Sequence, residues 1–368
     1  MFASNTHDFG LFTARFSTPA DDNLPYYSHS IIEGINTCPR WGHIRYIQRK
    51  YYASQYRQMA LEAGSAMHEV FAAFRITQLA HPEAQNMPAL AMRNAARVFG
   101  RNAPLVITDV TNKSFRDAAM KNCFNALEHS RFYDDPDDKI RTMANMEVTT
   151  IRYVDEQIKS MDNNDIWYVP GDDLAGIEIP FSIVISDKST GTSIRYIGTI
   201  DGICYYRNPN ESYIRIDENK TAARLDNAWR ESFRVKTQPT GYMVAATLLV
   251  GAPVEHTRII GVKVKQTNSH EDYLQCEESR SERGFDEWYN TLMFTHNILT
   301  EPYRKQPLAA PQFTHSCNRY FRPCGLIDLC DAKGDLEDAM YIYEGMVEAP
   351  LSPSEQAIIG GGKHTGDR

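Results

Sequence analysis

Two carboxylates and one lysine lie on neighbouring predicted strands at a spacing that could support phosphodiester hydrolysis. Asp201 lies in the segment GTIDG, and Glu218 and Lys220 lie in IRIDENK. Because side chains on a strand alternate between its faces, Glu218 and Lys220 share one face and Asp217 takes the other. We expect Asp201 to end the preceding strand, beside Glu218. Such carboxylates can hold Mg²⁺ or Mn²⁺, which lowers the pKa of a bound water, while the lysine stabilises the developing charge.

Each of these residues also has an ordinary structural interpretation. Glu218 and Lys220 could form a simple charge pair on a solvated strand. Upstream, His68 lies in GSAMH on an apolar helix face, where a histidine is usually a core residue. Gln238 and Tyr242 are four residues apart and so share a helix face, which also suits a surface amide and a half-buried tyrosine.

Taken together, the order of these residues resembles a known nuclease family. The order G-x3-H, E on a first strand (Glu178), G-x2-D, E-x-K and Q-x3-Y spans residues 64 to 242. It resembles the PD-(D/E)XK nucleases of the RecB-like exonuclease group, although the third motif carries a glutamate where aspartate is commoner. The resemblance implies a restriction-endonuclease-like fold and metal-dependent cleavage of DNA.

The resemblance also implies a role for each matching position. The divalent metal would be bound by His68, Asp201 and Glu218, with the backbone carbonyl of Asn219 as a further ligand. Lys220 would be the catalytic lysine. Gln238 and Tyr242 would steady the lysine and the nucleic-acid strand.

Four of the seven cysteines form a second pattern. Cys317, Cys324 and Cys330 are separated by six and five residues, and Cys38 lies far upstream. Four thiolates suit an iron–sulfur cluster or a structural zinc. The pattern is similar to the iron–sulfur subgroup of the same family, which includes the AddB nuclease domain and the CRISPR-adaptation nucleases. That resemblance implies a 4Fe–4S cluster that clasps the two ends of the nuclease core, although the subgroup commonly begins with C-x2-C. Zinc is the alternative, and the remaining cysteines are expected to be buried and unligated: Cys123, Cys204 and Cys276.

The overall charge limits how this chain could bind DNA. Lys and Arg total 39 and Asp and Glu total 47, a net charge of −8, which excludes nucleic-acid binding through bulk positive charge. Contacts with DNA must come from local basic patches or from metals that carry positive charge into an acidic site. For the first of the patches a solvated helix face is the alternative. The candidates are Arg40, Arg45, Arg49 and Lys50, with Arg234 and Lys236.

Periodicity predicts an α+β fold with an α/β/α core, in which a mixed sheet is flanked by helices. We expect a β-meander within residues 177–220, a helix that starts at Gln238-Pro239 and stops at Gly251, a strand over 257–265 and a helix over 282–299. The predicted segments are an irregular leader (1–30), a helical part of the nuclease domain with Cys38 (31–80), a helical insertion (81–170), the nuclease core (171–310), a cysteine segment (311–350) and a disordered tail (351–368).

These patterns favour a Mg²⁺- or Mn²⁺-dependent DNA exonuclease in DNA processing, recombination or repair. DNA that is single-stranded or has free ends is the expected substrate. The chain has no P-loop, so a helicase or recombination protein would be a separate partner. A catalytically silent DNA-binding or assembly subunit with the same fold is the alternative. With no apolar run of membrane length and no signal peptide, a cytoplasmic protein without membrane contact is expected.

Overall fold

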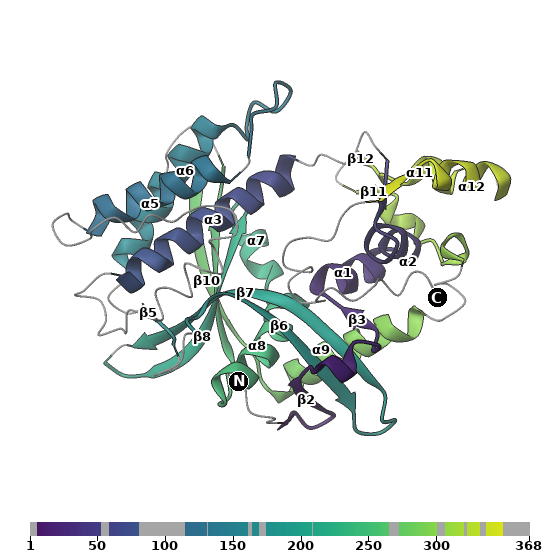
Figure 1. Cartoon of the computed structure of the whole chain (residues 1–368), viewed down its shortest axis with the longest axis horizontal. Helices are drawn as coiled ribbons and strands as arrows, with labels where there is room; N and C mark the ends of the chain where they lie inside the picture. Colours follow the sequence, from purple (N-terminus) through teal and green to yellow (C-terminus); the bar gives the residue numbers. More distant parts are fainter. Residues whose placement is uncertain are drawn as a thin grey trace. The chain divides into compact units, whose positions relative to one another are not determined.

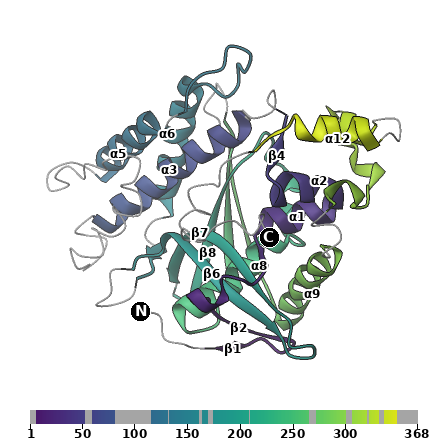
Figure 2. The ribbon, with the colours of Figure 1, turned by 45° about the vertical axis from the view of Figure 1, so that its right-hand side comes forward.

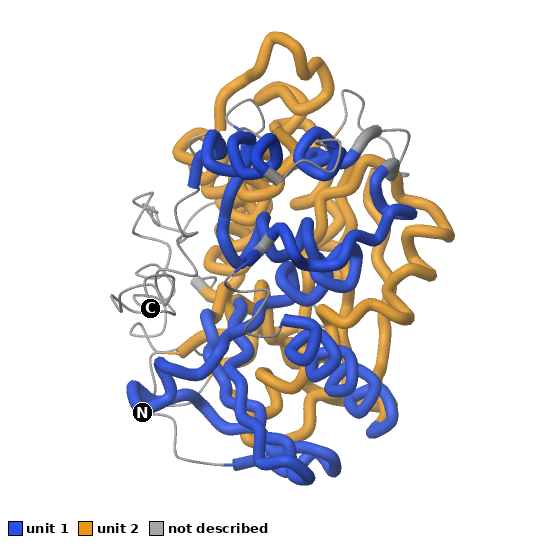
Figure 3. The backbone as a smooth tube through the Cα atoms, turned by 90° about the vertical axis from the view of Figure 1, so that its right-hand side faces the viewer, with its two compact units in different colours: residues 1–57, 180–198, 282–368 blue, residues 58–179, 199–281 orange. Residues whose placement is uncertain are grey.

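The computed structural model describes residues 6–52, 59–80, 115–130, 132–160, 164–168, 174–207, 209–264, 272–299, 306–319, 322–331 and 336–348. The chain divides into two compact units (Figure 3): unit 1 comprises residues 1–57, 180–198 and 282–368, and unit 2 comprises 58–179 and 199–281. These units do not coincide with the segments expected from the sequence. The physical reason is that the long strands β6 (Ile177–Asp187) and β7 (Ser193–Arg207) each run through both units.

Unit 2 is built on a mixed, mostly antiparallel sheet. In it β7 pairs antiparallel with β5 (Asn164–Ile166) and with β8 (Ser212–Thr221). β8 runs parallel to β9 (His256–Val262), which pairs antiparallel with β10 (Tyr273–Ser279). The parallel pair requires a crossover connection, which α7 (Asn227–Ser232) and α8 (Thr237–Val250) provide. Gly251 ends α8 in the left-handed conformation that glycine adopts without strain, as the sequence predicted.

Helices cover both faces of this sheet, and the residues of β9 show which helices lie on each face. Ile260 and Val262 pack in one core with α3 (Met59–Ala80), α5 (Phe115–His129) and α6 (Met143–Lys159). These three helices lie side by side (Figures 1 and 2). Ile259 instead packs on Phe233, and Gly261 lies against Trp229 of α7. The α+β class and the mixed sheet flanked by helices are therefore confirmed.

Unit 1 contains the N-terminal strands, which correct the prediction of an irregular leader over residues 1–30. β1 (His7–Asp8) pairs with β2 (Phe12–Phe16), β2 pairs with β6, and β3 (Tyr26–Tyr27) pairs with β7. Phe12 and Ala14 are buried and alternate with the partly exposed Thr13 and Arg15. This period-two pattern is short and lies among polar residues and prolines, which is why composition concealed it.

The rest of unit 1 is helical, with two small two-stranded antiparallel sheets. The helices are α1 (His29–Thr37), α2 (Pro39–Gly42), the π-helical turn His43–Ile47, α9 (Glu282–Ile298), α11 (Ile327–Cys330) and α12 (Leu336–Glu344). The strands are β4 (Lys50–Tyr51) with β13 (Val347–Glu348), and β11 (Asn318–Arg319) with β12 (Arg322–Pro323). Three short 3₁₀ turns complete the described chain: Pro19–Asp21, Pro307–Ala309 and Thr314–Ser316.

Several helices and strands predicted from the sequence are present in the structure. Helix is confirmed over most of the described part of 31–80, and the predicted helical insertion contains α5 and α6. The strand predicted over 257–265 is β9, and β10 was not predicted. The predicted tail, 351–368, lies outside the described residues, as does 81–114 of the predicted insertion. Among the described helices, none is both long and apolar enough to cross a membrane.

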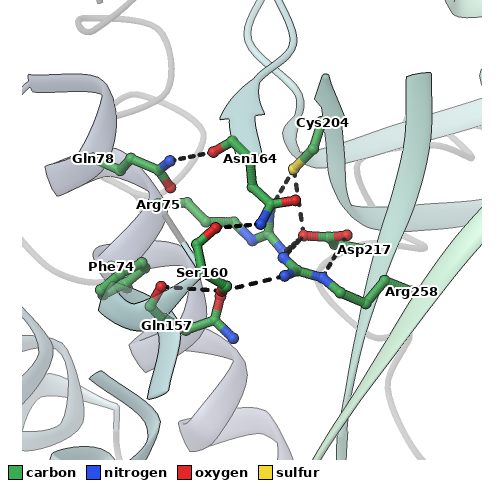
Figure 4. Close-up of a pocket in the computed structure, with 9 residues that line it drawn as sticks. All are labelled: Phe74, Arg75, Gln78, Gln157, Ser160, Asn164, Cys204, Asp217 and Arg258. Atoms are coloured by element: carbon green, nitrogen blue, oxygen red, sulfur yellow. Dashed lines mark hydrogen bonds and ion pairs between the residues drawn. The ribbon is translucent and has the colours of Figure 1, made fainter. Parts of the chain in front are cut away.

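A buried charge cluster lies on the face of β8 that carries Asp217. Three arginines from different elements converge on this carboxylate: Arg75 of α3, Arg215 of β8 and Arg258 of β9. Arg75 Nη2 lies 3.0 Å from Oδ2, while Arg258 Nε and Arg215 Nε lie 3.1 Å and 3.2 Å from Oδ1. Figure 4 shows Arg75 and Arg258 on Asp217, with Cys204 beside them. The cluster therefore ties α3, β8 and β9 together through one anion.

The electrostatics of Asp217 show how strongly the cluster depends on this charge. Burial by itself would raise the pKa of the carboxyl group. The three guanidinium groups outweigh that effect and hold the pKa well below its usual range. The carboxylate is therefore ionised throughout the physiological pH range.

We predict that Asp217→Asn lowers the free energy of unfolding by about 3–5 kcal/mol, because it leaves buried guanidinium groups without their anion. Urea unfolding followed by circular dichroism measures the change. Glu231→Gln is the matched control, since Glu231 forms an exposed pair with Arg234 and its loss should cost at most about 1 kcal/mol. Equal losses in the two variants would contradict the structural role of the cluster.

Candidate metal and catalytic site

The candidate site lies in unit 2, where the backbone pairing of β7 with β8 ends. The last pair of this ladder is Gly202 with Asp217, whereas β8 stays paired with β9 as far as Thr221. One step beyond the ladder, the backbone N–H of Asn219 donates to Asp201 Oδ2 at 2.7 Å. Asp201 thus lies inside β7 rather than at its end as predicted, and its side chain takes the place of a backbone acceptor. This hydrogen bond holds the Asp201 carboxylate against β8.

His68 and Glu178 complete a group of potential metal ligands around Asp201. His68 Nδ1 lies 3.5 Å from Asp201 Oδ1 and 3.7 Å from Glu178 Oε1. One ligand atom from each of the three residues lies within 4.8 Å of the others. The spacing suits a single cation with histidine and carboxylate ligands. His68 is therefore not a sealed core residue, since 34% of its side chain is exposed.

Glu178 is the member of this group that the sequence did not predict as a ligand. It is the glutamate of the first strand in the motif order and lies between Ile177 and Ile179 near the start of β6. In the structure its backbone has φ +46°, a left-handed conformation that is unusual for a residue other than glycine. Such strain is often found at functional sites. The only signal in the sequence was an acidic residue between two apolar ones.

Glu218 and Lys220 share one face of β8, as predicted, and α8 covers them. Lys220 Nζ lies 2.5 Å from Glu218 Oε1, and Gln238 Nε2 donates to the same oxygen at 2.9 Å. Gln238 also donates to the Tyr242 hydroxyl at 3.1 Å. Gln238 therefore orients Glu218 directly. The other oxygen, Glu218 Oε2, is buried and has no hydrogen-bond partner among the described residues. A buried carboxylate oxygen without a partner is what a cation ligand looks like before the ion is added.

The site concentrates negative charge. Burial raises the pKa of both Asp201 and Glu218, with Glu178 adding to the rise at Asp201 and Asp201 adding to the rise at Glu218. At His68, burial disfavours the imidazolium, but Asp201 and Glu178 outweigh it and raise the pKa to about 9. The carboxylates thus repel one another in a poorly solvated place, and a divalent cation would relieve that repulsion.

The backbone and the side chain of Asn219 differ in their contacts. Its backbone N–H is used by Asp201. Its side-chain amide is fully buried, and neither polar atom has a hydrogen-bond partner within the described part of the chain. The predicted use of its backbone carbonyl as a metal ligand stays a prediction.

The four predicted cluster cysteines all lie in unit 1, and the described cysteines form no disulfide. Burial raises the pKa of Cys324, and the neighbouring Cys317 and Cys38 add to the rise. Burial likewise raises the pKa of Cys330, and Cys324 and Cys38 contribute there too. These mutual effects place the four thiols in one neighbourhood. No described cysteine, however, belongs to a group of three ligand atoms as tight as the one around His68.

The other three cysteines are separate from this group. All three are buried, as the sequence predicted, and none forms a disulfide: Cys123, Cys204 and Cys276.

Three of the six basic residues predicted to bind DNA form hydrogen bonds or ion pairs within unit 1. Arg40 Nε donates to the Ala310 carbonyl at 3.0 Å, and Arg49 pairs with Glu348. Lys50 Nζ donates to the Tyr343 carbonyl at 3.3 Å. These side chains attach the C-terminal segment to the N-terminal helices.

Arg45 and the two basic residues of unit 2 differ from that group. Arg45 stacks 3.3 Å from the Tyr51 ring, and burial lowers its pKa to about 10. Arg234 is exposed and pairs with Glu231, while Lys236 lies over the Phe233 ring. Arg234 and Lys236 lie within four residues of Gln238 and so bring positive charge close to the site.

Comparison with known proteins adds no family assignment. No model of a known protein family matches the chain, and no curated protein matches it. Among solved structures, Scheffersomyces stipitis Rai1 in complex with (3'-NADP)⁺ and calcium ion is 9% identical over 81% of this chain and 83% of that chain, with a TM-score of 0.19. A likeness at this level carries no argument about fold or function.

Proposed function

We propose that the protein is a metal-dependent nuclease that hydrolyses phosphodiester bonds in DNA. The observation that carries this proposal is the convergence of an imidazole, three carboxylates and an ammonium group at the end of the β7–β8 ladder. These groups are His68, Glu178, Asp201, Glu218 and Lys220. The order of these residues also supports it, since it resembles the RecB-like PD-(D/E)XK exonucleases.

The residues present suit a Mg²⁺ or Mn²⁺ ion. His68, Glu178 and Asp201 offer three ligand atoms within 4.8 Å, and Glu218 adds a buried oxygen that lacks a partner. A bound Mg²⁺ or Mn²⁺ would lower the pKa of an attacking water and offset charge on the scissile phosphate.

The residues around the proposed metal site have distinct roles in this proposal. Lys220 holds its ammonium group at the edge of the carboxylates, where it can orient the water and stabilise negative charge on the phosphate oxygens. Gln238 keeps Glu218 in one rotamer by donating to Oε1, and Tyr242 supports Gln238. Asn219 fixes Asp201 through its backbone N–H. These contacts orient the acidic groups before any substrate is present.

A 4Fe–4S cluster held by Cys38, Cys317, Cys324 and Cys330 belongs to the same proposal. A zinc ion with tetrahedral bonds of about 2.3 Å needs sulfur atoms about 3.8 Å apart. Among the described residues, no three cysteine sulfurs lie within 4.8 Å of one another. What supports the cluster is the resemblance of this cysteine pattern to the iron–sulfur subgroup, in which four thiolates hold the cluster, and zinc is the alternative.

A silent DNA-binding or assembly subunit is the second candidate. It would need no complete set of ligands and no lysine. The intact set around Asp201, with Lys220 on Glu218, favours the enzyme.

We expect Glu218→Gln and Lys220→Met each to lower DNA hydrolysis with Mn²⁺ by at least about 10²-fold. Glu218→Gln removes a charged ligand of the cation that would offset charge on the phosphate, and Lys220→Met removes the ammonium group that would stabilise that charge. The assay compares end-labelled single- and double-stranded DNA, in linear and circular forms. Lys188→Met is the control, since Lys188 pairs with Asp8 at an exposed site in unit 1. If both site variants degrade DNA at the parent rate, the nuclease proposal fails.

Glu178→Gln should weaken Mn²⁺ binding by about 10- to 100-fold, because it removes a charged ligand but keeps the shape of the side chain. Titration of Mn²⁺ without DNA, followed by electron paramagnetic resonance, measures the affinity. Glu147→Gln on the exposed face of α6 controls for the loss of one negative charge. Unchanged affinity in Glu178→Gln would remove Glu178 from the ligand set.

Protein purified without oxygen should be brown and contain about four iron and four sulfide ions per chain. Cys324→Ser should lose the colour and the iron, whereas Cys276→Ser, at a buried free thiol of unit 2, should keep both. A colourless parent protein with stoichiometric zinc would contradict the cluster and favour the zinc alternative.

A further inference from the structure

Arg75 contacts the sheet of unit 2 beside two residues of the candidate site. Its Nη2 donates to Asp217, which precedes Glu218 in β8. Its guanidinium group also packs on Gly202, which follows Asp201 in β7. A Cβ at position 202 would lie 2.4 Å from Arg75 Nη1 and 2.5 Å from Cζ, so the absence of a side chain there is what makes room for the guanidinium.

Arg75 and His68 belong to the same helix face. They are seven residues apart in α3, which is two helical turns, so both side chains leave the helix in nearly the same direction. His68 reaches Asp201 and Glu178, and Arg75 reaches Asp217 and the Cys204 sulfur, the latter at 3.1 Å. α3 is therefore held against the strands at two points on one face. Two such points fix both the rotation of the helix and its position along its axis.

Arg75 differs in one respect from the other two arginines on Asp217. Arg215 and Arg258 belong to β8 and β9, strands that backbone pairing already holds together. Arg75 is the one of the three that joins α3 to them, whereas Arg258 also donates to Ser160 Oγ, at the end of α6, at 3.4 Å. It is 3% exposed, and its planar guanidinium serves a carboxylate and a thiol at once, a geometry that lysine cannot reproduce.

We propose that Arg75 is a positioning residue for the metal site, which sets the place of the His68 imidazole by fixing α3 against Asp217 and Gly202. This inference rests on the proposed function, since it concerns the cation that His68 would bind. Groups that orient a metal ligand from behind are commonly needed for full affinity. Arg75 would thus act on metal binding without touching the metal or the substrate.

The test measures Mn²⁺ affinity without DNA, together with thermal unfolding, in Arg75→Met and Arg258→Met. Both variants remove one guanidinium from Asp217, but only Arg75→Met releases α3. We expect Arg75→Met to weaken Mn²⁺ binding by about tenfold or more and Arg258→Met to leave it close to the parent value. Arg75→Lys keeps the positive charge but lacks the planar guanidinium, so it should also weaken Mn²⁺ binding. It replaces Arg75→Met in the test if that variant does not fold.

A double variant shows whether Arg75 acts through His68. In His68→Ala the ligand is gone, so adding Arg75→Met should weaken Mn²⁺ binding no further. Additive losses, or an equal loss in Arg258→Met, would overturn the positioning role.

Mn²⁺ binding by the parent protein distinguishes failure of the positioning role from failure of the proposed function. If it binds Mn²⁺ and Arg75→Met binds it equally well, only the positioning role fails. If the parent binds no Mn²⁺, the proposed function fails and this inference fails with it.

Discussion

The hydrogen bond from the Asn219 backbone to the Asp201 carboxylate is the interaction on which the site depends. At this point β7 stops pairing with β8, and a buried N–H would otherwise lack an acceptor, at a cost of about 1–3 kcal/mol. Asp201 Oδ2 satisfies that N–H, and Oδ1 remains turned toward His68. One side chain therefore closes the end of a ladder and joins two strands to a helix. Because the acceptor of this N–H is a carboxylate rather than a backbone carbonyl, it adds a negative charge to the site.

One face of β8 carries side chains of the candidate site, and the other face carries a buried charge cluster that stabilises the fold. Glu218 and Lys220 face α8 and form the chemical part of the site. Asp217, one residue earlier, faces α3 and holds a cluster of buried arginines. Because the strand alternates, neither set can shift without moving the other.

Several positively charged side chains of this protein contact other groups of the protein itself. The chain is acidic overall, yet several of its cations lie inside unit 2 around Asp217 or attach the C-terminal segment in unit 1. Two of the basic residues predicted to contact DNA, Arg40 and Arg49, have protein partners in the structure. Sequence shows where positive charge occurs along the chain, but not whether it is already paired.

The sequence by itself determined what local periodicity and spacing control. It predicted the face shared by Glu218 and Lys220, the pairing of Gln238 with Tyr242 on α8 and the stop at Gly251, because each depends on a few adjacent residues. Only the tertiary structure brought Glu178 to His68 and Arg75 to Asp217, and only it placed Asp201 inside β7. The two contacts join residues 110 and 142 positions apart, and all three features depend on how β7 leaves β8 and how α3 packs on the sheet. No local pattern encodes either arrangement.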